Sequence, residues 1–170
     1  AIVAKKLPSI ALKDEQPAVG LVDVKSLAGA YEFATAARSA GIQPIVGCDF
    51  ETEHGFITLI SQNANGWKNL LTITRAQAKN AQRIVSDEVI CGNNDGLILL
   101  AGGPESALEH RLSSGRVEAN DWLKLYMPVF GERMFIEINR LTGRRQSEAV
   151  LDRISHAYNL PLVGTSTAAY

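Results

Sequence analysis

The sequence predicts an α/β fold built on a mostly parallel sheet or barrel, and three observations indicate this class. Short apolar runs alternate with stretches of helical periodicity along the chain. Segments rich in glycine, proline and asparagine separate the two kinds of stretch. The 170 residues are 46% apolar and 21% charged, which is ordinary for a globular protein and argues against disorder, collagen and coiled coil. Because this length supports one domain with a real core, we expect residues 1–170 to form a single domain.

Each predicted strand is a short apolar run bounded by turn residues, the pattern of strands buried in a sheet. These strands cover residues 18–22, 42–50, 56–60, 97–101, 134–138 and 160–165. Asp23 closes the first of them. The triplet Glu53-His54-Gly55 separates the second strand from the third, and so short a link favours an antiparallel pair.

The predicted helices carry apolar residues at three- and four-residue spacing. They cover residues 3–11, 27–40, 65–78, 86–89, 105–112, 117–129 and 146–158. In the first helix Pro8 is tolerated only in the opening turn, and the second ends at Gly41. Helical spacing places Tyr31 on the apolar face of the second helix, and Trp122 and Leu125 among the buried side chains of the sixth.

The charge balance bounds the possible partners and the compartment. With 17 basic and 18 acidic side chains the formal net charge is −1, so the chain lacks the basic field of a stand-alone nucleic-acid binder. Cys48 and Cys91 fit neither a disulfide framework nor a zinc pattern and are expected to be reduced thiols. We find no signal peptide and no spanning segment, and we expect a cytoplasmic protein. The chain opens on a helix-like stretch and stops on a strand-like one, which suggests a piece of a longer protein.

Three acidic residues are expected at the carboxyl ends of strands, where parallel sheets and barrels carry their functional residues. They are Asp23, Asp49 and Glu137. Their oxygens could bind divalent cations. The same acids could instead cap helices or close turns, and the residues alone favour that structural role. Residues 137–140 and 165–167 lie at the corresponding ends of the last two strands.

Other chemistry-bearing patterns are weak. His54, His110 and His156 form no metal-binding motif and are expected on the surface or in helix packing. The chain contains no serine-hydrolase elbow, no phosphate-binding loop and no dinucleotide fingerprint. The segment Gly102-Gly103-Pro104 precedes a predicted helix and could hold an anion there, although plain turn chemistry explains it equally well.

Arg140, Arg144 and Arg145 form a small basic cluster that could meet phosphate, although a solvated loop is the simpler interpretation.

Several stretches, in register along most of the chain, resemble one known family. The block at residues 40–50, AGIQPIVGCDF, is the most specific and is similar to that family's AGIKPIIGCEF. The other matching stretches are residues 17–23, 27–33, 59–71, 96–103, 130–138 and 160–165. The family is the PHP (polymerase and histidinol phosphatase) domain at the amino end of the bacterial replicative DNA polymerase III alpha subunit. The resemblance implies a distorted, TIM-like β/α barrel, incomplete here because the chain begins after the family's first His-x-His strand.

The resemblance also implies a degenerate metal site. In family members with an intact site, strand-end histidines and acids hold a metal cluster that hydrolyses phosphoesters. Where the family has Asp-His this chain has Asp23-Val24, and Leu141 and residues 166–170 replace two further histidine-bearing stretches. Asp23, Asp49 and Glu137 survive as remnant metal-site positions, Asp49 in place of the usual Glu. We therefore expect no catalytic residue, no metal and no cofactor.

By resemblance, the chain is a non-catalytic part of a replicative DNA polymerase. It would act as a structural scaffold and as a docking surface for a proofreading exonuclease subunit, contacting the rest of the alpha chain, reaching DNA only indirectly and meeting no membrane. The polymerase activity itself would reside elsewhere in the parent chain. The alternatives are a metal-dependent PHP phosphoesterase or 3′–5′ exonuclease with the surviving acids as ligands, and an unrelated α/β binding module.

Overall fold

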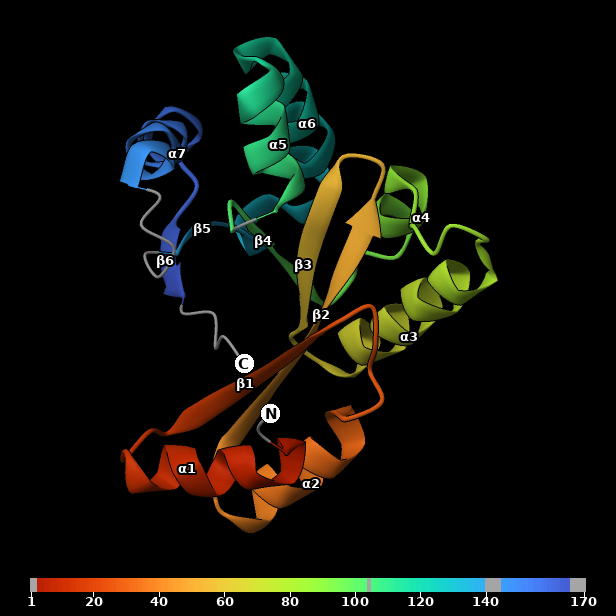
Figure 1. Ribbon diagram of the computed structural model, residues 1–170, viewed down its shortest axis with the longest axis vertical. Coiled ribbons are helices and arrows are strands. Elements are labelled where there is room, and N and C mark those ends of the chain that lie inside the picture. The colour runs from red at the N-terminus through yellow and green to blue at the C-terminus, as the bar shows by residue number, and fades with distance from the viewer. Residues whose placement is uncertain (1–2, 104, 140–144, 166–170) are drawn as a thin grey trace.

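A computed structural model describes residues 3–103, 105–139 and 145–165, with the side chains of residues 116 and 145–147 excepted. The strands of this part of the chain form one curled sheet, an open half-barrel (Figure 1). In spatial order they are β1 (Ala18–Val24), β2 (Gln43–Thr52), β3 (Gly55–Ser61), β4 (Leu97–Ala101), β5 (Met134–Asn139) and β6 (Leu162–Thr165). Every neighbouring pair is parallel except the two that β3 makes. The predicted α/β class, its mostly parallel sheet and its incomplete barrel are confirmed.

Helices connect the strands and surround the outside of the curled sheet (Figure 1). They are α1 (Leu7–Lys13), α2 (Ala30–Ser39), α3 (Ala64–Lys79), α4 (Asp87–Gly92), α5 (Ala107–Ser114), α6 (Arg116–Phe130) and α7 (Arg145–Tyr158), with short 3-10 turns at Ala4–Lys6 and Gly131–Arg133. The β1–α2–β2 segment is a parallel βαβ unit, as predicted. Pro8 lies in the first turn of α1, where its missing N–H leaves no hydrogen bond unmade. Among the described residues no helix has the length and apolar character needed to cross a membrane.

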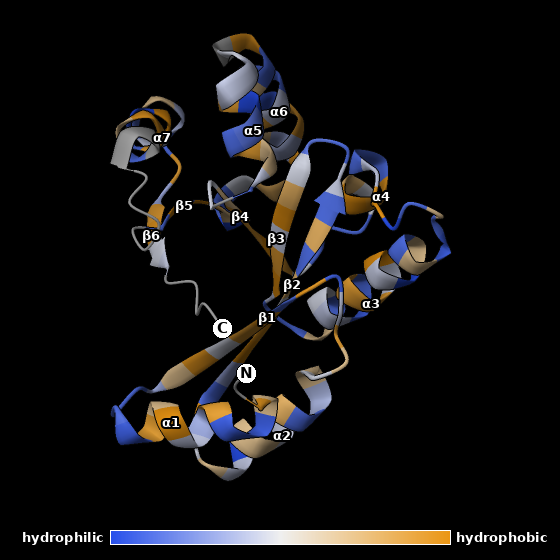
Figure 2. Ribbon diagram, in the orientation of Figure 1, coloured by the Kyte–Doolittle hydropathy of each residue, from blue (hydrophilic) through white to orange (hydrophobic). Residues whose placement is uncertain are grey.

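The sheet has two unlike faces because side chains alternate along each strand. The outer face, which the helices cover, presents a row of fully buried residues in adjacent strands: Cys48, Leu59, Leu99 and Met134 pair in register. This row forms part of the hydrophobic core, and Figure 2 shows hydrophobic residues running along the central strands β3 and β4. The opposite side, here called the inner face, is only half-buried and carries polar and acidic groups among its apolar ones.

Three aromatic side chains, spaced four residues apart on α6, fasten this helix to the core. The ring centroids of Trp122 and Tyr126 lie 4.6 Å apart, and those of Tyr126 and Phe130 lie 6.1 Å apart. The Tyr126 hydroxyl donates a 2.6 Å hydrogen bond to Asp87 Oδ1 at the start of α4. All three rings are almost fully buried, so this ladder contributes a large share of the packing between the sheet and its helices.

Several predicted boundaries were wrong for identifiable reasons. The helix predicted to start beside Pro104 begins instead at Ala107, because Ser106 is its N-cap and accepts a 3.2 Å hydrogen bond from the Glu109 amide. Pro104 itself lies outside the described residues. The last strand begins at Leu162, since the amide of Leu160 donates to a carbonyl at the end of α7.

Three predictions of burial were also wrong. The strand predicted to be buried at residues 18–22 is an edge strand whose inner-face residues are accessible, with Val22 37% exposed. Tyr31 was placed on the apolar face of α2 but is 82% exposed, and Leu125 on α6 is 43% exposed. In each case the residue is apolar by type, but within the described part of the chain no second element covers it.

Candidate functional site: the inner face of the half-barrel

The strand register brings the inner-face residues together row by row. Asp49 of β2 is opposite Thr58 of β3, Thr58 is opposite Leu100 of β4, and Leu100 is opposite Phe135 of β5. Residues two apart on a strand share a face, so Glu137 follows Phe135 on this face. Two of the three acids predicted from the sequence therefore share the inner face of the sheet.

Asp49 is held in the middle of β2. It was predicted at a strand end, but hairpin pairing continues β2 to Thr52. Thr58 Oγ1 donates a 2.6 Å hydrogen bond to Asp49 Oδ1, and the Lys25 amide donates to the Asp49 carbonyl oxygen at 2.9 Å. Burial raises the pKa of Asp49, and the bond from Thr58 partly opposes that shift because it stabilises the charged carboxylate.

Glu137 is held on β5 by its neighbour β6. Thr165 Oγ1 donates to Glu137 Oε1, and Asn139 Nδ2 donates to the same Thr165 oxygen at 3.5 Å. Burial raises the pKa of Glu137, the bond from Thr165 lowers it, and the negative charge of Asp49 raises it. Glu137 and Asp49 therefore repel one another across the inner face.

Asp23 lies on the other face of the sheet. It pairs in register with Cys48, whose side chain is in the buried core, whereas the next residue, Val24, pairs with Asp49. A methyl group built on Gly29 would lie 3.4 Å from Asp23 Oδ2, which places this carboxylate beneath the start of α2. Asp23 therefore does not share a face with Asp49 and Glu137, because Asp23 and Asp49 stand at register positions one residue apart.

Asp23 instead has Cys48 as an electrostatic neighbour. Burial raises the pKa of the Cys48 thiol to about 12, and the charges of Asp49 and Asp23 add to the effect. Cys48 is thus an inert core thiol rather than a nucleophile.

The glycine pair before α5 packs against Glu137 rather than facing an anion. A Cβ on Gly103 would lie 2.5 Å from Glu137 Oε2, and one on Gly102 would lie 2.8 Å from the Glu137 carbonyl oxygen. Gly102 also has a φ of +116°. Gly103 thus lets the Glu137 carboxylate approach closely, and Gly102 does the same for the Glu137 backbone, so turn chemistry explains this pair better than an anion site does.

The remaining sequence candidates lie away from the inner-face acids or outside the described residues. His54 is in the β2–β3 hairpin, His110 on α5 and His156 on α7, each apart from Asp49 and Glu137. The basic cluster at residues 140, 144 and 145 is not described, apart from the backbone of residue 145, and neither are residue 141 and residues 166–170.

Sequence reasoning missed Thr58, which donates to Asp49, and the ion pair of Lys25 with Glu51 one step further along the same face. The partner of Glu137, Thr165, lies in the candidate range 165–167. The observed hairpin has a two-residue turn, Glu53-His54, which pairs Asp49 with Thr58. The sequence predicts a three-residue turn at residues 53–55, and that turn would shift the pairing by one residue.

The sequence of this chain matches one protein family, the PHP domain, over residues 1–141. The chain belongs to the PHP domain family. A DNA polymerase III subunit alpha from Caulobacter vibrioides is 31% identical over 98% of this chain. This match therefore extends beyond residue 141. The same subunit from Escherichia coli K12 is 31% identical over 91% of the chain. The alignments cover only 16% and 14% of those relatives, so this PHP chain spans about a sixth of their length.

Solved structures share the PHP fold at low identity. A Bifidobacterium adolescentis protein assigned as a metal-dependent phosphoesterase superposes with a TM-score of 0.60 at 13% identity, covering 96% of this chain and 81% of that one. An amidohydrolase from Chromobacterium violaceum gives a TM-score of 0.59 at 12% identity, covering 100% and 82%. At these identities the likeness establishes the fold alone.

The inner-face side chains do not fit the metal cluster that an intact PHP site implies. Within the part of the chain that the structure describes, no three His, Cys, Asp or Glu side chains gather closely enough to hold a metal ion. Asp49 and Glu137 each accept a hydrogen bond from a threonine, while Asp23 lies on the outer face. The side chain of Val24, beside Asp49 on the inner face, offers no ligand atom, so the donor set of the described residues lacks both number and convergence.

Proposed function

We propose that this chain is a catalytically silent PHP domain of a bacterial replicative DNA polymerase alpha subunit. Residues 1–170 form one domain there, which acts as a structural scaffold and as a docking surface for a proofreading exonuclease subunit. Family membership and the polymerase relatives support the placement in an alpha subunit.

The observation that carries the silent role is the division of the acids between two faces of the sheet. Metal-assisted phosphoester hydrolysis requires several ligands that converge on one ion and leave a position open for water. Asp23 is on the outer face beside Cys48, and Val24 occupies the adjacent inner-face position. The other two remnant acids, Asp49 and Glu137, are separated on the inner face by the strands β3 and β4.

Charge and cysteine chemistry support the remaining parts of the proposal. A formal charge of −1 leaves DNA binding to other regions of the polymerase, so this domain meets DNA only indirectly. The free thiols Cys48 and Cys91 agree with a cytoplasmic location, where thiols stay reduced.

The alternative function, a metal-dependent phosphoesterase or 3′–5′ exonuclease, has one observation in its favour. Asp49 and Glu137 share a half-buried face, and burial together with their mutual charge raises the pKa of Glu137, which is a feature of functional carboxylate pairs. The two functions differ in metal content and turnover.

The deciding experiment measures both quantities in protein purified with added manganese or zinc. We expect no stoichiometric metal by mass spectrometry and no hydrolysis of bis(p-nitrophenyl) phosphate or of a 3′-labelled oligonucleotide above the level of Asp49→Asn. Stoichiometric metal, with turnover abolished by Asp49→Asn or Asp23→Ala, would establish the phosphoesterase and end the proposal.

Docking is tested separately by calorimetric titration with the proofreading exonuclease subunit of the same organism. Saturable one-to-one binding is the expected result. No heat of binding to the full-length protein, in a preparation that still extends primers, would refute the docking role and leave the silent-domain proposal standing.

A further inference from the structure

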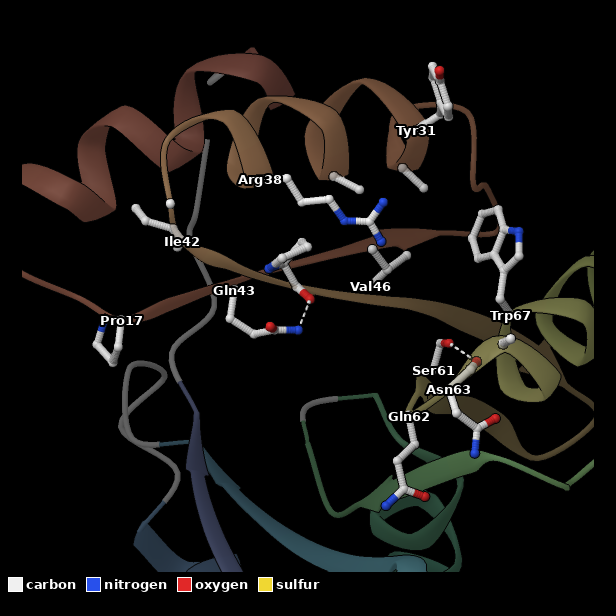
Figure 3. A pocket seen from close by; sticks show the side chains of 15 residues that line it. Pro17, Tyr31, Arg38, Ile42, Gln43, Val46, Ser61, Gln62, Asn63 and Trp67 are labelled. Atoms are coloured by element: carbon white, nitrogen blue, oxygen red, sulfur yellow. Dashed lines mark hydrogen bonds between the residues drawn. The ribbon is translucent and has the colours of Figure 1, made fainter.

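A groove of about 870 Å³ opens on the helix-covered side of the sheet, between α2 and the N-terminus of α3 (Figure 3). Its floor is formed by Pro44 and Val46 of β2, and its walls by Ala34 on α2 and Ala64 on α3. Because these side chains are small or apolar, they leave room for a ligand and offer it an uncharged contact surface. The groove is remote from the inner-face acids, since Val46 shares the outer face with Cys48.

The α3 wall of the groove is rigidly built. Asn63 caps α3 and its Oδ1 accepts hydrogen bonds of 3.0 Å from the amides of Asn65 and Gly66. Ser61 Oγ donates to the Asn63 carbonyl oxygen at 3.1 Å. Trp67, which follows Gly66, therefore lies in a well-anchored first turn of α3. A side chain that is already fixed loses little conformational entropy when a ligand binds.

Among the described residues that line the groove, Arg38 alone has a formally charged side chain. Within the described part of the chain its guanidinium has no ion pair and no hydrogen bond. Figure 3 shows it extending from α2 into the space above Val46. An unpaired guanidinium over an apolar floor is a ready partner for a carboxylate, because its planar donors match the two carboxylate oxygens.

Two aromatic residues also line the groove. Tyr31 stands on the rim with 82% of its surface exposed, and Trp67 is half-buried on the opposite wall. Tyr, Trp and Arg are the three residue types that most often dominate the energy of protein–protein contacts.

We infer that this groove binds an extended peptide segment of a partner protein, with a carboxylate on Arg38 and an adjacent apolar or aromatic side chain between Tyr31 and Trp67. Charge selects the peptide over a nucleic acid, because a polyphosphate backbone needs several cations and this groove supplies one. The inference does not depend on which subunit docks, and it holds or fails independently of the metal content of the inner face.

The test selects short random peptides displayed on phage against the full-length protein, with counter-selection on its Arg38→Glu variant. We expect enriched sequences to carry Asp or Glu next to Phe, Trp, Leu or Ile. A synthetic copy of the most enriched peptide should bind Arg38→Glu and Tyr31→Ala at least about tenfold more weakly, as is typical of interface hot spots. The matched control is Arg75→Glu on the exposed side of α3, which should bind like wild type.

Charge reversal separates recognition from a folding defect. A peptide in which Lys replaces the acidic residue should bind Arg38→Glu better than wild type. Absence of enrichment, equal binding by Arg38→Glu and wild type, or failure of the reversed pair would overturn the inference. Tighter binding of single-stranded oligothymidylate than of the peptide, with the same sensitivity to Arg38→Glu, would assign the groove to nucleic acid instead.

Discussion

Arg133 ties the start of β5 to the loop before β4, and its removal is the sharpest stability test that the structure offers. Its Nη1 donates to the carbonyl oxygens of Asn94 at 2.6 Å and Leu97 at 2.7 Å. Its Nη2 donates to Asn94 Oδ1 at 2.8 Å and to the Val129 carbonyl oxygen at 3.2 Å. The guanidinium also lies 5.5 Å from the centre of the Phe130 ring. One side chain thus joins the loop before β4, the end of α6 and the start of β5.

The cost of Arg133→Ala follows from these bonds. A hydrogen bond to a charged group contributes roughly 1.5–3 kcal/mol, but bonds that share one side chain are not additive. Because the site is only part-buried, water can reach some of the freed carbonyl oxygens. We expect a loss of about 3 kcal/mol in the free energy of unfolding. Arg133→Lys should lose about half as much, since one ammonium group cannot span all of these acceptors.

Urea unfolding followed by the fluorescence of the buried Trp122 measures this loss. With a slope of about 2 kcal/mol/M, the urea midpoint of Arg133→Ala should fall by about 1.5 M. Arg75→Ala is the matched control, because Arg75 is exposed on α3 and should change stability by less than about 0.5 kcal/mol. If the midpoints of the two variants coincide, the four bonds do not stabilise the fold and the reasoning fails.

Three further outcomes concern other parts of the fold. Gly66→Ala should lower Tm by about 10 °C, because its Cβ would overlap a facing backbone carbonyl, whereas Gly92→Ala has open space and should shift Tm by no more than about 2 °C; equal shifts would contradict this packing. Burial raises the pKa of Asp49, so the folded state binds the Asp49 proton more tightly than the unfolded chain does. The stability of the wild type relative to Asp49→Asn should therefore fall as the pH rises from the ordinary carboxyl pKa to the raised one. Thermal melts across that interval check the sign, and a widening advantage for wild type would refute it. In the native protein iodoacetamide should modify Cys91 before Cys48, whose pKa is about 12 and which is fully buried; peptide mass spectrometry showing the reverse order would disprove the burial argument.

Local patterns in the sequence predicted most of the elements. Each predicted strand and helix is present, and the antiparallel hairpin and the βαβ unit were confirmed because their signals depend on residues close together in the chain. The family resemblance rested on blocks of the same kind, and the match over residues 1–141 confirmed it.

Predictions about which side a residue faces were less successful. Tyr31 has the right spacing for an apolar helix face, but α2 has no neighbour on that side. Asp49 was placed at a strand end because the sequence does not show how far hairpin pairing extends β2. Such features depend on what lies across from a residue, which no short window of sequence contains.

The three acids show most clearly what each level decides. Sequence alone determined that Asp23, Asp49 and Glu137 fall in strands of one α/β sheet and that few imidazoles accompany them. Only the tertiary structure decided that Asp23 faces the helices while Asp49 and Glu137 lie on the inner face of the sheet. Side chains alternate along a strand, so a register difference of one residue exchanges the faces. Strand pairing therefore separates Asp23 from Asp49 and Glu137 in this PHP domain, and the residues that the structure describes bring no three ligand side chains together.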